Sequence, residues 1–375
     1  MELPATRRVV GSMILVCVVA CADSREPPPD VPAPYRFPLG MNDITMVMPL
    51  PSAPDETILL RIDGSDGATP IVPRDLFDRV ARTDSQLDYS VAQVATVRFD
   101  LCRRDDASPC PPGVDGELRL VLQDQLRQPT HTVFDPAMHA LYTIPAGEVP
   151  KVVDELHALA DLAGIPTTSP LLVHPAVLGS PAYRARLRAL VATYARADRL
   201  HRLALSFAFD GIMIGRVWNF RGVEIGATGA ISDLLSQSVG SKSFTIFYVQ
   251  PSADKPPGLK LAFDELAFEV AAAPERMKAV QALVEAQNPR KQGFADMECA
   301  ACHLSSTILE HDASSVGVDP KTLPGRFTTT YDVSAKEAEF HGLGYVSQSP
   351  VISQRAANET ANALVEFETQ YPSAP

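Results

Sequence analysis

The sequence predicts an α+β fold, in which a strand-rich α+β region over residues 39–272 is followed by an all-α region over residues 273–375. Residues 91–101 and 117–123 alternate between apolar and polar side chains, which is the period-2 pattern of strands with one buried face. Beyond residue 273, apolar side chains recur at helical spacing instead. The length of 375 residues and the apolar fraction of 46% are those of a globular protein of two or three domains.

The first 38 residues have the pattern of an export signal and a linker. A basic start and an apolar run too short to span a bilayer are typical of a signal peptide, here over residues 1–21. Val18-Val19-Ala20-Cys21 resembles a bacterial lipobox, so Cys21 is expected to be lipidated; the alternative is an ordinary signal peptide with an incidental cysteine. Residues 22–38 are rich in proline and predict a semi-rigid spacer.

The strand-rich region begins at residues 43–50, which predict a buried strand running into a turn. Their methionines are expected in the core, because no His or Cys lies close enough in sequence to complete a copper site. A polar loop with Cys102 and Cys110 at its ends joins the strands at 91–101 and 117–123. In an oxidising compartment this pair predicts a disulfide that stabilises the hairpin by about 2–3 kcal/mol.

Two helices and a group of strands are predicted next. Residues 150–163 and 181–198 predict the helices. Strands are predicted at residues 203–209, 212–214, 217–220 and 243–249, with Asp210-Gly211 as a hairpin turn.

This region shows no nucleophile elbow, phosphate loop or dinucleotide-binding fingerprint. Its histidines lack the spacing of metal ligands, such as two on one helical turn, and each is expected to be a surface or core residue. They are His131, His139, His157, His174 and His201. No role is therefore predicted for residues 39–272.

The strongest chemical signal is Cys299-Ala300-Ala301-Cys302-His303. Two cysteines three apart, with a histidine directly after the second, have the spacing for covalent attachment of a c-type haem. Each thiol adds across one haem vinyl group, and the histidine is carried beneath the ring as the proximal iron ligand. With 6 Cys and 8 His in 375 residues, roughly 0.002 such matches are expected by chance.

Other uses of Cys299 and Cys302 stay open at this point: a disulfide, a redox-active dithiol or half of a zinc site. A zinc site needs further Cys or His ligands at comparable spacing, and no second cysteine pair accompanies this one. A thioredoxin-like dithiol belongs to a βαβ unit, which the flanking sequence does not suggest. The predicted export favours haem, because in c-type cytochromes generally attachment takes place outside the cytoplasm.

The sequence around the motif resembles a class I c-type cytochrome. Residues 274–288 predict a helix before the motif. Residues 353–368 predict a closing helix after a loop-rich stretch, with Ser353 as its cap. The apolar face of that closing helix is expected to consist of Ala357, Ala361, Leu364 and Val365.

The resemblance implies a cytochrome c-like domain over residues 273–375 that holds one covalently bound haem c. By this likeness Cys299 and Cys302 carry the thioether bonds, and His303 is the proximal ligand of the haem iron. The two terminal helices of that family pack against each other beside the haem edge.

The sixth iron position departs from the family pattern. The family usually supplies a methionine there, and this chain has none after Met297, which lies too close to Cys299 to reach the opposite face. His341, where the family's distal loop would fall, is the candidate distal ligand. His311, a lysine and an open, water-bound site are the alternatives. Imidazole in place of thioether generally lowers the haem potential.

Together these observations predict a membrane-tethered monohaem electron carrier on the periplasmic side of a bacterial cell envelope. Its expected partners are the membrane, through the lipid on Cys21, and an unidentified redox protein; the net charge of −12 argues against nucleic acid. Two alternatives stay open. One is a haem peroxidase or oxidase with an exchangeable sixth ligand, so enzymatic activity is undecided. The other is a cell-envelope binding lipoprotein with an accessory haem.

Overall fold

The computed structural model describes residues 39–53, 56–102, 113–124, 134–164, 171–211, 215–234, 236–240, 246–249, 256–293, 297–327, 342–346 and 348–371. These residues all belong to one compact unit, which spans Arg36–Ser373. The predicted signal peptide and linker, Cys21, Cys110 and His341 lie outside the described residues, so the predictions made for them stay predictions.

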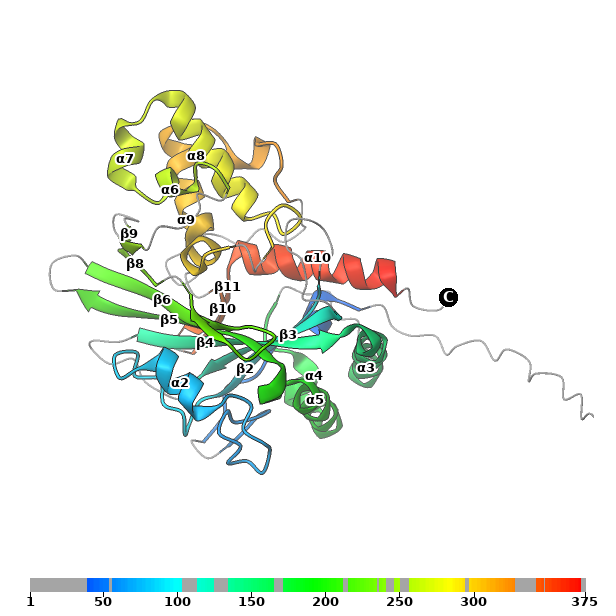
Figure 1. The fold of residues 1–375 in the computed structure, drawn as a ribbon. Coiled ribbons are helices and arrows are strands. Elements are labelled where there is room, and N and C mark those ends of the chain that lie inside the picture. The colour runs from blue at the N-terminus through cyan, green and yellow to red at the C-terminus, as the bar shows by residue number, and fades with distance from the viewer. Residues whose placement is uncertain are drawn as a thin grey trace, which may run out of the picture. The chain divides into compact units, whose positions relative to one another are not determined.

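A nine-stranded antiparallel sheet is the central element (Figure 1). Eight strands follow one another in the order β1-β2-β3-β4-β5-β6-β8-β9, and β7 pairs with β6 beside this path. The strands are β1 (Thr45–Val47), β2 (Gln93–Leu101), β3 (Val114–Gln123), β4 (Phe134–Pro145), β5 (Leu200–Gly211), β6 (Gly215–Ile225), β7 (Ile231–Asp233), β8 (Gln237–Gly240) and β9 (Ile246–Val249).

The helices fall into an early and a late group. The early ones are α1 (Met41–Ile44), α2 (Arg74–Ala81), α3 (Val149–Ala163), α4 (Pro175–Gly179) and α5 (Pro181–Tyr194). The late ones are α6 (Leu259–Ala262), α7 (Glu265–Val270), α8 (Ala273–Ala286), α9 (Cys299–Ser315) and α10 (Gln354–Gln370). A hairpin of β10 (Leu343–Val346) and β11 (Ser349–Ile352) lies between α9 and α10, and short 3₁₀ turns occur at Ala146–Glu148, Ala197–Arg199 and Pro320–Thr322.

One face of the sheet is apolar because side chains alternate along each strand. The antiparallel register aligns one such row across five strands, and every member of the row is buried. The row consists of Val97, Leu120, Ala140, Leu203 and Val223. Helices α2, α3 and α5 contribute apolar side chains to the same core.

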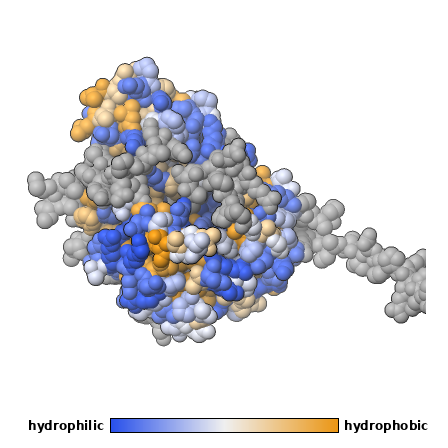
Figure 2. Space-filling view, viewed as in Figure 1, coloured by the Kyte–Doolittle hydropathy of each residue, from blue (hydrophilic) through white to orange (hydrophobic). Residues whose placement is uncertain are grey.

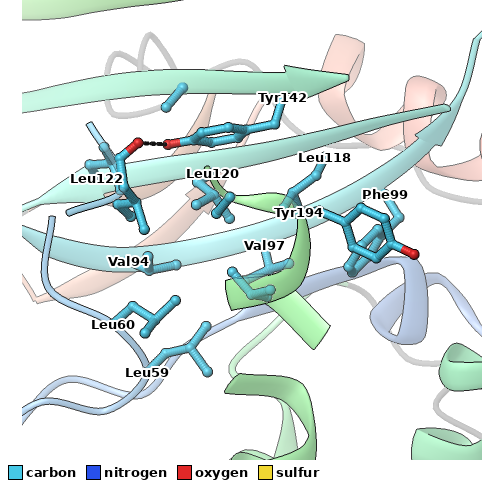
Figure 3. Close-up of a cluster of buried hydrophobic side chains, with 14 of the residues drawn as sticks. Leu59, Leu60, Val94, Val97, Phe99, Leu118, Leu120, Leu122, Tyr142 and Tyr194 are labelled. Atoms are coloured by element: carbon cyan, nitrogen blue, oxygen red, sulfur yellow. Dashed lines mark hydrogen bonds between the residues drawn. The ribbon is translucent and has the colours of Figure 1, made fainter. Parts of the chain in front are cut away.

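Figure 3 shows part of this core, where leucine and valine side chains of β2 and β3 meet Leu59, Leu60 and Tyr194. Tyr142 of β4 is buried there, and its hydroxyl donates to the Ile71 carbonyl at 3.1 Å. A buried Tyr hydroxyl needs such a partner, so this bond lets an aromatic ring fill the core without leaving a polar atom unsatisfied.

The opposite face carries charged and small side chains. The row adjacent to the apolar one reads Arg98, Arg119, Leu141, Arg202 and Glu224 from β2 to β6. The next row on this polar face reads Thr96, Val121, His139, Ala204 and Gly222. Contacts from α9, α10 and the β10–β11 hairpin cover this polar face. It is the side on which the Cys-Ala-Ala-Cys-His motif lies.

Most of the predicted elements are present with shifted ends. The predicted strands at 91–101 and 117–123 are β2 and β3, and the helices predicted at 150–163, 274–288 and 353–368 are α3, α8 and α10. Helix α3 ends as the glycine predicts, because Gly164 takes a left-handed conformation with φ 69°. The α+β class is therefore confirmed, with mainly helices toward the C-terminus.

Two local predictions in the strand-rich region differ from the structure. The strand predicted at 43–50 is present only as β1, Thr45–Val47, because Asp43 and Ile44 belong to the helical turn of α1, where the Asp43 carboxylate accepts from the backbone N–H of Gly40 at 2.7 Å. Asp210 and Gly211 are not a turn; they pair with Arg216 and Gly215 inside the β5–β6 ladder. The methionines at positions 41, 46 and 48 are buried, as predicted for core residues.

Two predictions in the C-terminal region are also wrong. The residues directly after the motif are helical and not a loop, because α9 extends from Cys299 to Ser315. The region is not all-α either, since the β10–β11 hairpin lies within it. Hydrophobic spacing at Leu304 and Ile308, both buried, continues the helix beyond the motif.

The predicted apolar face of helix α10 is confirmed in part: Ala357 is buried and Leu364 packs against the core, whereas Val365 is 46% exposed. The helix also buries Arg355, Asn358 and Glu359, which were not expected to be buried. These polar residues are buried because the helix also lies against the polar face of the sheet. Ser353 caps the helix as predicted, accepting from the backbone N–H of Ala356 at 3.1 Å.

The surface seen in Figure 2 is largely hydrophilic, with apolar area at the position of α7. Leu266 and Val270 of this helix are 70% and 86% exposed. Within the described residues, no helix combines the length and hydrophobicity that a membrane crossing requires.

Candidate functional site

The Cys-Ala-Ala-Cys-His motif opens helix α9. Cys299 is the first residue of the helix, and Cys302 follows one turn later, where its backbone N–H donates to the Glu298 carbonyl at 3.0 Å. Neither cysteine is disulfide-bonded in the structure; Cys299 is half-buried and Cys302 is buried. Residues three apart share one side of a helix, so a single turn presents both thiols in the same direction.

Gln237 of β8 attaches the start of α9 to the sheet. Its side-chain carbonyl accepts from the backbone N–H of Ala300 at 3.0 Å, and its amide donates to the Glu298 carboxylate. The first turn of a helix leaves four backbone N–H groups without intrahelical partners, and this buried side chain satisfies one of them. The sheet therefore sets the position of the motif.

A cavity of about 200 Å³ lies between α9 and the polar face of the sheet. Cys299, Cys302 and His303 of the motif form one part of its wall. The sheet, the hairpin and α10 supply the other parts: Arg119, His139, Arg202, Ala204, Gly342, Leu343, Ala356 and Glu359. Leu234, Met297 and Glu298 complete the wall, so two thiols, two imidazoles, two guanidinium groups and two carboxylates border one cavity.

The imidazole of His303 is enclosed by side chains of the sheet. Its ring lies 5.7 Å from the ring of His139 in β4, at an interplanar angle of 79°, and 5.1 Å from the ring of Phe220 in β6. The backbone of Gly342 covers it as well, because a Cβ at that position would lie 3.0 to 3.3 Å from three atoms of the imidazole. Gly342 also has φ 58°, so this position favours glycine on two grounds.

Burial raises the pKa of both thiols of the motif. The pKa of Cys302 rises to about 12. The pKa of Cys299 is raised for the same reason, although the charge of Arg202 opposes the shift. Redox-active dithiols have a lowered pKa that makes the thiolate accessible near neutral pH. Burial thus shifts the pKa of both thiols in the direction opposite to that of a redox-active dithiol.

Glu359 of α10 is the centre of a buried ion cluster beside the cavity. Its carboxylate accepts from Arg355 at 2.6 Å, from Arg98 at 2.7 Å and from Arg119 at 3.1 Å. Burial alone would raise the pKa of Glu359, but the three positive charges outweigh burial and hold the pKa well below its usual range. The carboxylate is therefore ionised at neutral pH and holds three arginines in place, of which Arg119 lines the cavity.

Arg355 also ties this cluster to the end of α8. Its guanidinium group donates to the carbonyl of Ala286 at 2.8 Å and to the carbonyl of Gln292 at 2.6 Å. The last carbonyls of a helix have no intrahelical donors, so a cation there is stabilised. One buried side chain thus links α8, α10 and the sheet.

Arg119 and Arg202 bring positive charge directly to the cavity. Arg119 is 5% exposed, and burial, which would lower its pKa, is outweighed by Glu359, Asp100 and Glu117, so the pKa of Arg119 is raised. Arg202 is 6% exposed and pairs with the carboxylate of Glu224. Buried guanidinium groups suit planar anions such as carboxylates, which they bind through paired hydrogen bonds.

This donor set fits a c-type haem chemically. The two thiols match the two vinyl groups of the porphyrin, an imidazole matches the iron, and two guanidinium groups match the two propionate carboxylates. The cavity is smaller than the roughly 300–1,000 Å³ typical of cofactor sites. A porphyrin therefore requires its wall to widen, and small residues line it at Ala204, Gly342 and Ala356.

The structure thus brings Cys299, Cys302 and His303 together at one cavity. His311 is elsewhere: its Nδ1 lies 3.1 Å from Asp312 Oδ1, its side chain is 47% exposed, and it does not line the cavity. Cys102 is disulfide-bonded. Its predicted partner Cys110 lies outside the described residues, so the pairing itself stays a prediction.

Sequence reasoning missed several residues of the site. His139 was expected to be an ordinary surface or core residue, and Arg119, Arg202 and Glu359 were not singled out. Alternation along β4 and β5 would have placed His139, Arg202 and Ala204 on one face, but only the strand pairing puts them at one cavity. Within the described part of the chain, no group of three His, Cys, Asp or Glu side chains could hold a metal ion by itself.

Comparison of the chain with protein-family models, with curated proteins and with solved structures found no match.

Proposed function

We propose that this protein is a membrane-tethered, extracytoplasmic c-type cytochrome that holds one haem and transfers electrons. The observation that carries the proposal is the cavity beside α9. Two thiols one helical turn apart, and the imidazole that follows them, border that cavity together with two buried arginines.

Cys299 and Cys302 are the proposed attachment points of the haem. Each thiol adds across one vinyl C=C bond, so a carbon–sulfur bond forms and the thiol proton passes to the neighbouring vinyl carbon. No oxidant is consumed in this addition. His303, buried against the sheet, is then the proposed proximal ligand of the iron.

Arg119 and Arg202 are the proposed partners of the haem carboxylates. Both guanidinium groups are buried at the cavity wall, and the ion cluster around Glu359 holds Arg119 in place. Bound haem supplies a one-electron iron couple, whose potential the axial ligands and burial determine. The chain's own contribution is ligand identity, orientation and exclusion of water.

The location of the protein is proposed from its first 38 residues. Export through the signal peptide, a lipid on Cys21 and the proline-rich spacer would place the folded part at the periplasmic side of a membrane, within reach of a redox partner. Replacing Cys21 by Ser should release the protein from the membrane fraction of a bacterial host. Membrane-bound Cys21→Ser protein would argue against the lipid anchor.

The decisive experiment is the intact mass and absorption spectrum of the full-length protein exported by a host that matures c-type cytochromes. The polypeptide is expected to carry the mass of one haem, and the reduced protein should show the spectrum of haem c. The double variant Cys299→Ser/Cys302→Ser should lose the haem.

A matched control removes the other cysteine pair. Cys102→Ser/Cys110→Ser removes two cysteines as well, but it should keep the added mass of one haem, because Cys102 does not line the cavity. A wild-type mass without added porphyrin, or a Cys299–Cys302 disulfide in the mature chain, would refute the proposal.

A further inference from the structure

A second imidazole stands opposite the proximal histidine. His139 of β4 lines the same cavity as His303, and the two ring centres lie 5.7 Å apart. Within the described residues these are the two histidines at the cavity, and they come from the sheet and from α9 respectively.

The strand pattern explains why His139 points toward the motif. Its neighbours along β4, Met138 and Ala140, belong to the apolar core on the other face of the sheet. Its neighbours across the sheet are Val121 and Ala204. Because Ala204 is small, the imidazole has space on the cavity side, where it is 7% exposed.

The distance between the two rings suits a shared metal. Two imidazoles bound to one metal through bonds of about 2 Å have ring centres roughly 6 Å apart. The observed 5.7 Å is close to that spacing, and the 79° between the ring planes is compatible with axial imidazoles, whose mutual rotation is free. A neutral imidazole nitrogen is also a common iron ligand.

We propose that His139 is the second axial ligand of the haem iron, opposite His303. This inference rests on the proposed function, because it assumes that the haem attached to Cys299 and Cys302 occupies the cavity. It gives the strand-rich region a chemical role: the sheet closes the sixth coordination position.

The other candidate ligands differ in their position. His311 lies on α9 itself, beside Asp312 and half-exposed, away from the cavity wall. His341 lies outside the described residues and is the competing candidate that the experiment must distinguish. A protein with two axial imidazoles has no open iron position, so it should carry electrons instead of binding small ligands.

The test uses the full-length, haem-loaded protein. Wild type is expected to be low-spin in both oxidation states, and its reduced form should not bind carbon monoxide. His139→Gly should keep the covalent haem, become high-spin and bind carbon monoxide, and added free imidazole should restore the low-spin spectrum by filling the space of the deleted ring. His311→Ala and His341→Ala should leave the spectrum unchanged.

A second variant guards against misfolding of the glycine variant. His139→Met keeps a long ligand at this position, so it should remain six-coordinate with a reduction potential above that of wild type. The inference is overturned if haem-loaded His139→Gly or His139→Met is spectroscopically identical to wild type, or if His341→Ala alone becomes high-spin. Wild-type protein without covalent haem would refute the proposed function itself. The intact mass detects that outcome independently of the spectra of the variants.

Discussion

The two faces of the central sheet come from alternate residues of the same strands, yet they hold opposite kinds of side chain. Val97 and Leu120 face the apolar core, whereas Arg98 and Arg119, their immediate neighbours, are buried among charges on the other face. The apolar face stabilises the fold through removal of hydrocarbon from water. The polar face buries ions, which is unfavourable unless each is paired. Such arrangements are concentrated at functional sites.

The largest expected effect is the loss of stability when the carboxylate at the centre of the polar face is removed. Glu359→Gln removes the one carboxylate shared by Arg98, Arg119 and Arg355 and leaves buried positive charge without its partner. We expect a loss of about 3–5 kcal/mol in the free energy of unfolding, measured with chemical denaturant. Glu368→Gln, exposed on the same helix, should change it by less than about 0.5 kcal/mol. Equal effects of the two variants would mean that the cluster is not a stabilising unit.

A cavity on the apolar face should give a similar loss of stability with a different functional result. Leu120→Ala deletes a fully buried side chain and should lower the free energy of unfolding by about 2–5 kcal/mol. Because its side chain points away from the motif, the folded protein should keep one covalent haem with an unchanged spectrum. A changed spectrum in Leu120→Ala would show that the two faces are coupled.

Gly342→Ala tests the polar face of the sheet without changing the apolar face. An added Cβ meets the His303 ring at 3.0 Å, and the residue has φ 58°, so we expect a loss of about 1–3 kcal/mol and a perturbed haem spectrum. Gly317→Ala is the control, since Gly317 has φ 69° but open space around its would-be Cβ. It should show the backbone strain without the spectral change. Identical spectra for both variants would show that the residue at position 342 does not affect the surroundings of His303.

The smallest expected effect is a change in the free energy of unfolding at acidic pH. Because the pKa of Glu359 is lowered in the folded state, its contribution to stability is complete above about pH 4.5 and decreases as the pH falls below that value. The difference in unfolding free energy between wild type and Glu359→Gln should shrink by up to about 1.4 kcal/mol per pH unit there. Denaturant titrations of both proteins from pH 7 to pH 3 measure it. A difference that stays constant would contradict an ionised, arginine-paired Glu359.

Local patterns predicted the elements whose burial is apolar. Alternation defines β2 and β3, and helical spacing defines α3 and α8, because in these segments hydrophobic side chains face a hydrophobic partner. The motif was recognisable for another reason: the proposed covalent attachment of a haem would require this spacing of Cys299, Cys302 and His303 whatever the fold.

The polar half of the site could not be predicted in this way. Arg98 and Glu359 are 261 positions apart in the chain, and neither has a sequence context that indicates burial. The pattern of α10 was misleading for the same reason, since hydrophobicity suggested Val365 as a buried residue while its partner surface required Arg355 and Glu359. His139 likewise acquires its position from strand pairing and not from neighbouring residues.

The bond between Arg98 and Glu359 also constrains the order in which the protein matures. Glu359 belongs to α10, which follows α9 in the chain, so the wall of the cavity is incomplete until α10 has docked on the sheet. If the proposed haem is attached to the two cysteines, which precede α10 in the chain, they would be accessible before that docking. Docking of α10 would then enclose the proposed haem.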